Sequence, residues 1–192
     1  FDVKNRIWAP SILQAIDDSG KLIGCLPELI DSQDPIGTIT LEIARQFQLS
    51  PDVIVSSGGG DNMMGAIGTG NVFPGVVTTS LGTSGTIYSC ADKPIIDPKG
   101  ELAAFCSSSG HWLPLVCTMN VTVSTELIRT LLGLDVEDMN QKAASATVGS
   151  GGLTLLPYFY GERTPSLPNA KAVLYGITGV NYNSENLCRA AM

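Results

Sequence analysis

Two short glycine-containing segments carry the residue types best suited to chemistry. They are residues 57–62 (SGGGDN) and residues 80–86 (SLGTSGT). In each, glycines follow an apolar run, where they permit positive φ and let a ligand approach the backbone closely. The first segment offers the carboxylate of Asp61, and the second offers backbone amides and hydroxyls. Transfer of a phosphate to a hydroxyl needs both, because one group must accept the hydroxyl proton and another must hold the phosphate.

Two roles are open for Asp61. A carboxylate within hydrogen-bond reach of an attacking hydroxyl can take its proton, and the three preceding glycines leave space around it. Asp61 also stands where a helix is expected to begin, and Asp is a favoured helix cap. The two roles are compatible, because a helix N-terminus stabilises a negative charge.

Two roles are also open for the second segment. Successive backbone N–H groups in a glycine-rich turn can form an anion-binding nest, to which Thr83 would add a hydroxyl. An ordinary tight turn between two strands is the commoner structure for such a sequence. Gly82, Thr83 and Ser84 are therefore candidates for holding a phosphate, with a plain hairpin turn as the alternative.

The elements that must position these segments follow from the apolar patterns. Helices are expected after Pro10, between Thr40 and Pro51, over 62–70, over 124–132, and from an N-cap at Ser184. The small residues of 62–70 indicate close packing against a neighbour. A buried strand is expected at 53–55, a hairpin at 76–80 and 86–90, and further strands at 112–117 and 153–157. This alternation indicates an α/β fold.

Composition excludes several classes of function. The chain has 192 residues and a net charge of −7, and an acidic chain is poorly suited to nucleic acid. Its apolar runs are too short to span a bilayer. The five cysteines show no metal-binding or redox spacing, so we expect no metal site and a cytoplasmic protein with free thiols. The length suits one domain or parts of two, and the two ends suggest a piece of a longer protein.

Four motifs occur in a characteristic order: GGGDN at 58–62, SLGTSG at 80–85, LPYFYGERTP at 156–165 and AVLYGI at 172–177. In this order and spacing they resemble the FGGY carbohydrate kinases. The resemblance implies the α/β fold of actin, hexokinase and Hsp70 (ribonuclease H-like), with two domains of which only part of each is present. Residues 1–74 would end the first, sugar-binding domain, and residues 75–192 would begin the second, nucleotide-binding domain.

The resemblance also implies roles for the two segments. Asp61 would be the general base and would bind the sugar together with Asn62. Gly82, Thr83 and Ser84 would contact the phosphates of ATP.

Further nucleotide contacts are implied within residues 120–126. Relatives often carry a glycine pair after an Asn there, whereas Asn120 is followed here by Val121 and Thr122. Thr122 and Glu126 are the remaining candidates. The pair Glu162–Arg163 is expected to be a structural clamp that shapes the cleft.

The implied reaction is ATP-dependent phosphorylation of a sugar hydroxyl, with Mg²⁺ bridging the phosphates. D-xylulose, giving D-xylulose 5-phosphate, fits the motifs best, and gluconate, ribulose and glycerol are alternatives. A non-catalytic nucleotide-binding protein of the same fold is a rival of another class. The implied partners are a small sugar and ATP, with neither nucleic acid nor membrane, and a second copy in a homodimer.

Overall fold

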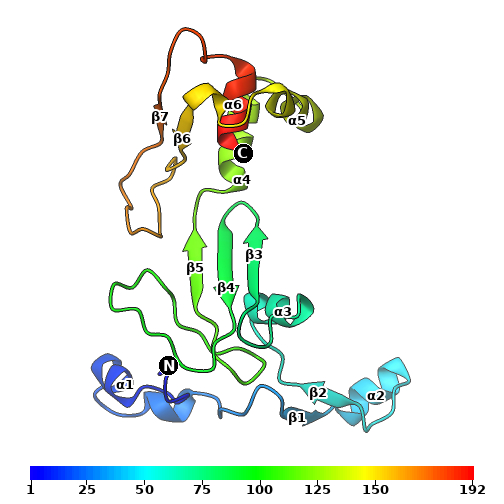
Figure 1. Cartoon of the computed structure of the whole chain (residues 1–192). Coiled ribbons are helices and arrows are strands. Elements are labelled where there is room, and N and C mark those ends of the chain that lie inside the picture. Colours follow the sequence, from blue (N-terminus) through cyan, green and yellow to red (C-terminus); the bar gives the residue numbers. More distant parts are fainter. The chain divides into compact units, whose positions relative to one another are not determined.

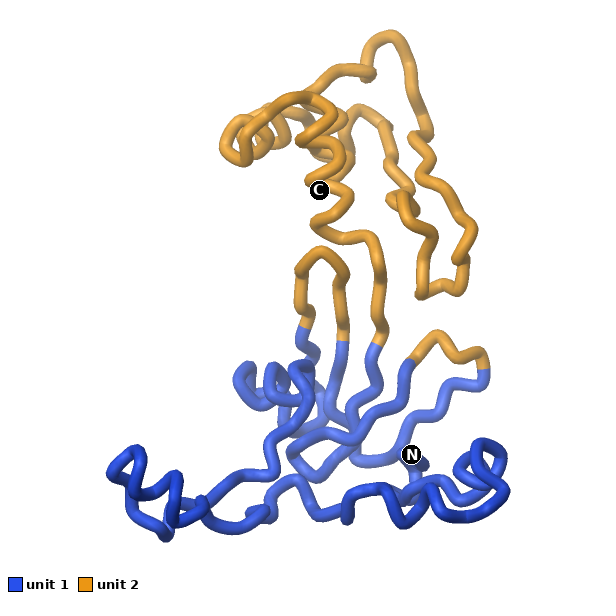
Figure 2. Tube along the Cα trace, turned by 180° about the vertical axis from the view of Figure 1, so that it is seen from behind, with its two compact units in different colours: residues 1–78, 88–98, 103–115 blue, residues 79–87, 99–102, 116–192 orange.

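The computed structural model describes all 192 residues, whose elements are labelled in Figure 1. They form two compact units, shown in Figure 2. Unit 1 comprises residues 1–78, 88–98 and 103–115, and unit 2 comprises residues 79–87, 99–102 and 116–192. No helix combines the length and apolar character needed to cross a membrane. The domain boundary expected between residues 74 and 75 stays a prediction.

Unit 1 begins with α1 (Pro10–Ile16) and the 3-10 helix η1 (Leu22–Cys25). Strand β1 (Pro35–Thr38) then pairs antiparallel with β2 (Ile54–Ser56), and α2 (Leu41–Phe47) lies between the two strands in the sequence. The expected N-cap of α2 is confirmed, because the Thr40 side chain accepts a hydrogen bond from the Ile43 N–H. The expected burial at 53–55 is wrong. The β1–β2 pair is a two-stranded ribbon, and both of its strands are exposed throughout.

Helix α3 (Asp61–Gly68) follows, and its small residues pack closely, as predicted. Ala66 is fully buried. A Cβ added at Gly65 would lie 2.8 Å from the hydroxyl of Tyr88. Beyond the helix, the fully buried Asn71 donates from Nδ2 to the Tyr88 carbonyl and accepts at Oδ1 from the Cys90 N–H. The segment after α3 is thereby fixed to the strand that contains Tyr88.

The next three strands form a sheet in the order β3-β4-β5. Their bounds are β3 (Val77–Leu81), β4 (Gly85–Ser89) and β5 (Leu115–Thr118). The predicted hairpin is confirmed as β3 and β4, which are joined by the glycine-containing turn (Figure 1). Strand β5 begins later than expected, because Trp112 forms isolated bridges with Ala91 and Cys106 instead.

Unit 2 continues with three α-helices, a 3-10 helix and a two-stranded sheet. Its elements are α4 (Thr122–Leu131), α5 (Val136–Ser145), the 3-10 helix η2 (Ser150–Gly152), β6 (Thr154–Leu156), β7 (Val173–Tyr175) and α6 (Ser184–Ala191). Strands β6 and β7 pair antiparallel. Helix α4 begins two residues earlier than expected, and α5 was not expected at all.

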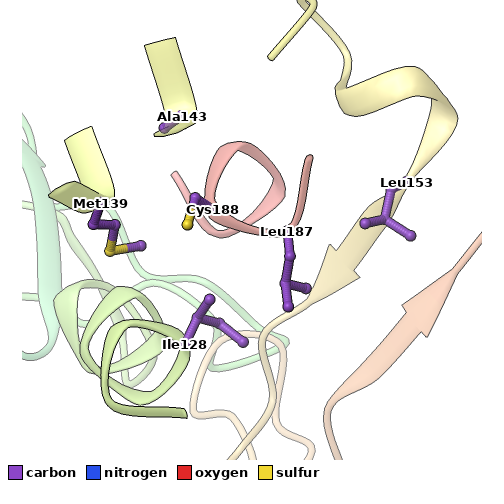
Figure 3. Packing of buried hydrophobic residues seen from close by; sticks show 6 residues of the cluster. All are labelled: Ile128, Met139, Ala143, Leu153, Leu187 and Cys188. Carbon is purple, nitrogen blue, oxygen red and sulfur yellow. The ribbon is translucent and has the colours of Figure 1, made fainter. Parts of the chain in front are cut away.

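The N-cap of α6 is Asn183, so the expectation of Ser184 is wrong. The Asn183 side chain accepts from the Asn186 N–H at 2.9 Å, and its backbone is extended, as a cap requires. Figure 3 shows α6 in the core of unit 2, where Leu187 and Cys188 lie with Ile128, Met139, Ala143 and Leu153. Residues of α4, α5, α6 and β6, together with Leu153 just before β6, thus share one apolar cluster.

An ion pair also joins α5 to α6, and it predicts that the stability of the fold depends on pH. Lys142 Nζ donates to Glu185 Oε1 at 2.8 Å, and this hydrogen bond is the main cause that lowers the pKa of Glu185 from 4.5 to about 2. Because the folded pKa lies below the unfolded one, the stabilisation is complete above about pH 4.5 and is lost as the pH falls toward 2. We expect the urea unfolding midpoint of the full-length protein to decrease as the pH is lowered from 7 to about 3. This decrease should be smaller in a Glu185→Gln variant than in the wild type, because the variant lacks the carboxylate that becomes protonated.

The matched control is Glu137→Gln, which changes an exposed glutamate of α5 that accepts only from Gln141. Its urea midpoint should fall with acid as the wild-type midpoint does. Equal acid sensitivity of the Glu185→Gln variant and the wild type would contradict the assignment.

Candidate active site

Asp61 is the first residue of α3, and Gly60 is the N-cap. The capping role considered for Asp61 is therefore not the one it has. Its Oδ1 accepts from the N–H of the next residue, Asn62, at 2.8 Å, and its side chain is exposed. The carboxylate thus lies in the first turn of a helix, where a negative charge is stabilised.

The glycine loop before Asp61 is fixed by the rest of unit 1. Gly58 has a φ of +69°, which favours glycine. A Cβ on Gly59 would collide with the hydroxyl of Ser108. Hydrogen bonds from Ser57 Oγ to the Ser32 carbonyl (2.8 Å) and from Ser32 Oγ to the Ser108 carbonyl (2.9 Å) hold the same three segments together. Gly58 and Gly59 therefore serve backbone conformation and packing, and their role in giving a ligand access to Asp61 stays a prediction.

The turn between β3 and β4 presents exposed Thr83 and Ser84. The Gly82 N–H donates to the Ser84 carbonyl at 3.0 Å, so this amide is engaged within the turn. Neither Gly82 nor Gly85 has a positive φ. Gly85 is instead required for packing, because an added Cβ would lie 2.7 Å from Val121 Cγ2. Binding of a phosphate at Gly82, Thr83 and Ser84 stays a prediction.

Two backbone hydrogen bonds attach this turn to the start of α4. The Val121 N–H donates to the Thr83 carbonyl at 3.2 Å, and the Thr122 N–H donates to the Gly82 carbonyl at 3.0 Å. The structure thereby brings Thr122 next to the hairpin turn within unit 2. Asp61 and Asn62 lie together in unit 1.

A cavity of about 410 Å³ lies beside the start of α4. It is lined by residues of unit 2 that include Leu81, Asn120, Thr122, Ser124, Leu155 and Ala190. Of the residues predicted to contact a nucleotide, Thr122 lines it. Two of its buried polar atoms, Asn120 Oδ1 and Ser124 Oγ, have no hydrogen-bond partner. Buried polar atoms are normally paired, so this cavity is suited to a ligand that supplies the missing partners.

Glu126 has a different environment from Thr122. It lies one turn further along α4 and forms an ion pair with Arg129, whose Nη2 is 2.7 Å from Oε2. The hydrogen bond from Arg129 lowers the pKa of Glu126. Glu126 does not line the cavity, and its contact with a nucleotide stays a prediction.

Glu162 is nearly inaccessible, with 4% exposure, and its carboxylate connects distant segments of unit 2. Oε1 accepts from the N–H groups of Met119 and Arg163, both at 2.7 Å, and Oε2 accepts from Asn120 Nδ2 at 3.1 Å. Burial by itself would raise the pKa of Glu162. The hydrogen bonds from Met119, Asn120 and Arg163 outweigh burial and hold this pKa below its ordinary value.

Glu162 and Arg163 were expected to form a structural clamp as a pair, but their side chains do not bond to each other in the structure. Arg163 contributes its backbone N–H to Glu162, while its guanidinium Nη1 lies 3.2 Å from Cys117 Sγ. The motif that contains Glu162 pointed to this residue, whereas nothing in the sequence pointed to Ser124.

Comparison with known proteins identifies the family. Residues 1–68 match the N-terminal domain of the FGGY family of carbohydrate kinases. The whole chain is 48% identical over 192 residues to the xylulose kinase of Haemophilus influenzae. The chain belongs to the FGGY family of carbohydrate kinases. It spans 39% of the length of that relative.

Solved FGGY kinases share the fold of the chain. The xylulose kinase of Bifidobacterium adolescentis matches with a TM-score of 0.82 and 30% identity, over 100% of this chain and 39% of that one. The gluconate kinase of Lactobacillus acidophilus matches with a TM-score of 0.86 and 25% identity, over 98% of this chain and 38% of that one. The predicted fold class is confirmed: the chain is a partial α/β structure of the actin/hexokinase-like fold of FGGY kinases.

Proposed function

We propose that the full-length protein transfers the γ-phosphate of ATP to a hydroxyl of D-xylulose. The observation that carries this proposal is the 48% identity to a xylulose kinase over the whole chain. The placement of Asp61 supports it, because an exposed carboxylate in the first turn of α3 follows a glycine loop fixed by packing. ATP is available in the cytoplasm, and the five free cysteines suit that reducing compartment.

In this mechanism Asp61 accepts the proton of the attacking hydroxyl, and Asn62 hydrogen-bonds the sugar. The deprotonated oxygen attacks the γ-phosphorus in line, and ADP leaves. Thr83 and Thr122 are the hydroxyl donors assigned to the phosphates. No three acidic, His or Cys side chains of this chain are grouped so that they could hold a metal ion by themselves. When bound, Mg²⁺ neutralises phosphate charge.

A second candidate substrate is gluconate. It is supported by the fold similarity to the gluconate kinase of Lactobacillus acidophilus, whose TM-score of 0.86 is close to that of the xylulose kinase. The same Asp61 chemistry would apply, because only the identity of the hydroxyl changes.

A coupled ADP-release assay on the full-length protein tests both candidates. The panel is D-xylulose, D-ribulose, gluconate and glycerol, each with ATP and Mg²⁺. We expect the highest kcat/KM for D-xylulose. A higher kcat/KM for gluconate would show that gluconate, and not D-xylulose, is the substrate. Binding of ADP without turnover of any of the four substrates would refute the kinase function.

A further inference from the structure

We propose that Glu162 is a positioning residue of the nucleotide site, acting through Asn120. Its buried carboxylate would fix the turn between β5 and α4, and Asn120 in that turn would accept a hydrogen bond from a ribose hydroxyl of the nucleotide. This inference rests on the proposed function, since it assigns the ligand of the cavity beside α4.

The turn formed by residues 119–122 is held from two sides. On one side, Met119 and Asn120 donate to the Glu162 carboxylate. On the other side, the backbone N–H groups of Val121 and Thr122 donate to the hairpin turn. Because these four residues are consecutive, loss of the Glu162 carboxylate would release the turn where it meets the hairpin.

The orientation of the Asn120 amide follows from its partners. Nδ2 donates to the Gly161 carbonyl at 2.7 Å and to Glu162 Oε2 at 3.1 Å. Both partners are acceptors, so the donor end of the amide must face them. Oδ1 is therefore left buried among the residues of the cavity without a donor.

The unpartnered atoms indicate the chemistry of the ligand. Asn120 Oδ1 can only accept, and an ionised phosphate has no hydrogen to donate to it. A sugar hydroxyl can donate to Asn120 Oδ1. A second hydroxyl can pair with Ser124 Oγ, which is also buried and unpartnered. Apolar neighbours such as Leu81, Leu155 and Ala190 suit the carbon face of the same ligand. A nucleoside ribose meets these requirements, and it would place the phosphates of the nucleotide near Thr122.

The test compares full-length wild type with Glu162→Gln, Asn120→Ala and the double variant. Calorimetry measures the Kd of ADP with Mg²⁺ and, separately, that of D-xylulose. Removing one partner of a buried hydrogen bond changes a Kd by about five- to 150-fold. We expect each single variant to raise the Kd of ADP at least about tenfold and to leave the Kd of D-xylulose unchanged. If Glu162 acts through Asn120, the double variant should bind ADP no more weakly than Asn120→Ala.

The control is Glu137→Gln, the same chemical change on an exposed glutamate; its Kd for ADP should equal that of the wild type. Unchanged ADP affinity in Glu162→Gln, or additive losses in the double variant, would overturn the inference. Equal losses for ADP and D-xylulose would also overturn it, because they indicate general destabilisation. If Glu162→Gln does not fold, unchanged ADP affinity in Asn120→Ala overturns it.

The test of Glu162 and the test of the proposed function can fail independently. A wild type that binds ADP but phosphorylates none of the four substrates refutes the kinase proposal. The ADP affinities of the variants still decide the role of Glu162.

Discussion

Replacing Asp61 by Asn in the full-length protein should lower kcat for D-xylulose phosphorylation by about 10³-fold, within the range typical of a general base. Asn has nearly the size of Asp and can still hydrogen-bond, but it cannot take the hydroxyl proton. The Kd of D-xylulose should change little, because the loop before Asp61 is fixed by Gly58, Gly59 and Ser57 rather than by the carboxylate. Steady-state kinetics and calorimetric sugar binding measure the two quantities.

The matched control for this variant is Asp52→Asn, which changes an exposed aspartate that interacts with Ser50 in a turn of the same unit. Its kcat should equal that of the wild type. If Asp61→Asn retained wild-type kcat, Asp61 would not be the base. If kcat and sugar affinity fell by the same factor, the loss would be explained by sugar binding alone, and the role of Asp61 as the base would lose its support.

The sequence predicts the part of the site that depends on local signals. Glycines beside an acidic residue indicate the loop before α3, and the small residues of α3 indicate its close packing. Both predictions succeed because they depend on neighbours in the sequence. The local signals fail at two helix N-termini. The N-cap of α3 is Gly60, where Asp61 was the candidate, and the N-cap of α6 is Asn183, where Ser184 was expected.

Long-range contacts are the part that the sequence does not show. The Glu162 carboxylate meets Met119 and Asn120 across 42 or 43 positions, and no local pattern encodes that pairing. The same holds for Gly85. A glycine-rich turn suggests an anion-binding nest, but the structure shows that this glycine is needed because Val121 lies against it. Burial of the Asn120 and Ser124 oxygens likewise becomes visible only in three dimensions.

The contact between Gly85 and Val121 leads to the second large effect. An alanine at position 85 would place its Cβ 2.7 Å from Val121 Cγ2 and 3.2 Å from Thr118 Oγ1. Val is stiff at χ1, so the hairpin turn and the start of α4 must move apart. A displacement of about 1 Å can reduce catalysis about 100-fold, and overpacking of this kind costs about 1–3 kcal/mol of stability. We expect Gly85→Ala to lower kcat/KM for ATP by up to about 100-fold.

The comparison with Gly179→Ala separates this contact from the general effect of adding a methyl group. Gly179 lies in the same unit, has no positive φ, and has no atom within 4 Å of an added Cβ. Its variant should keep the wild-type kcat/KM for ATP. Sugar affinity should be unchanged in both variants, because the predicted sugar-binding residues Asp61 and Asn62 belong to unit 1. If Gly85→Ala matched Gly179→Ala in kcat/KM for ATP, the fit between the hairpin turn and α4 would have no role in nucleotide binding, and the phosphates would have to be held elsewhere.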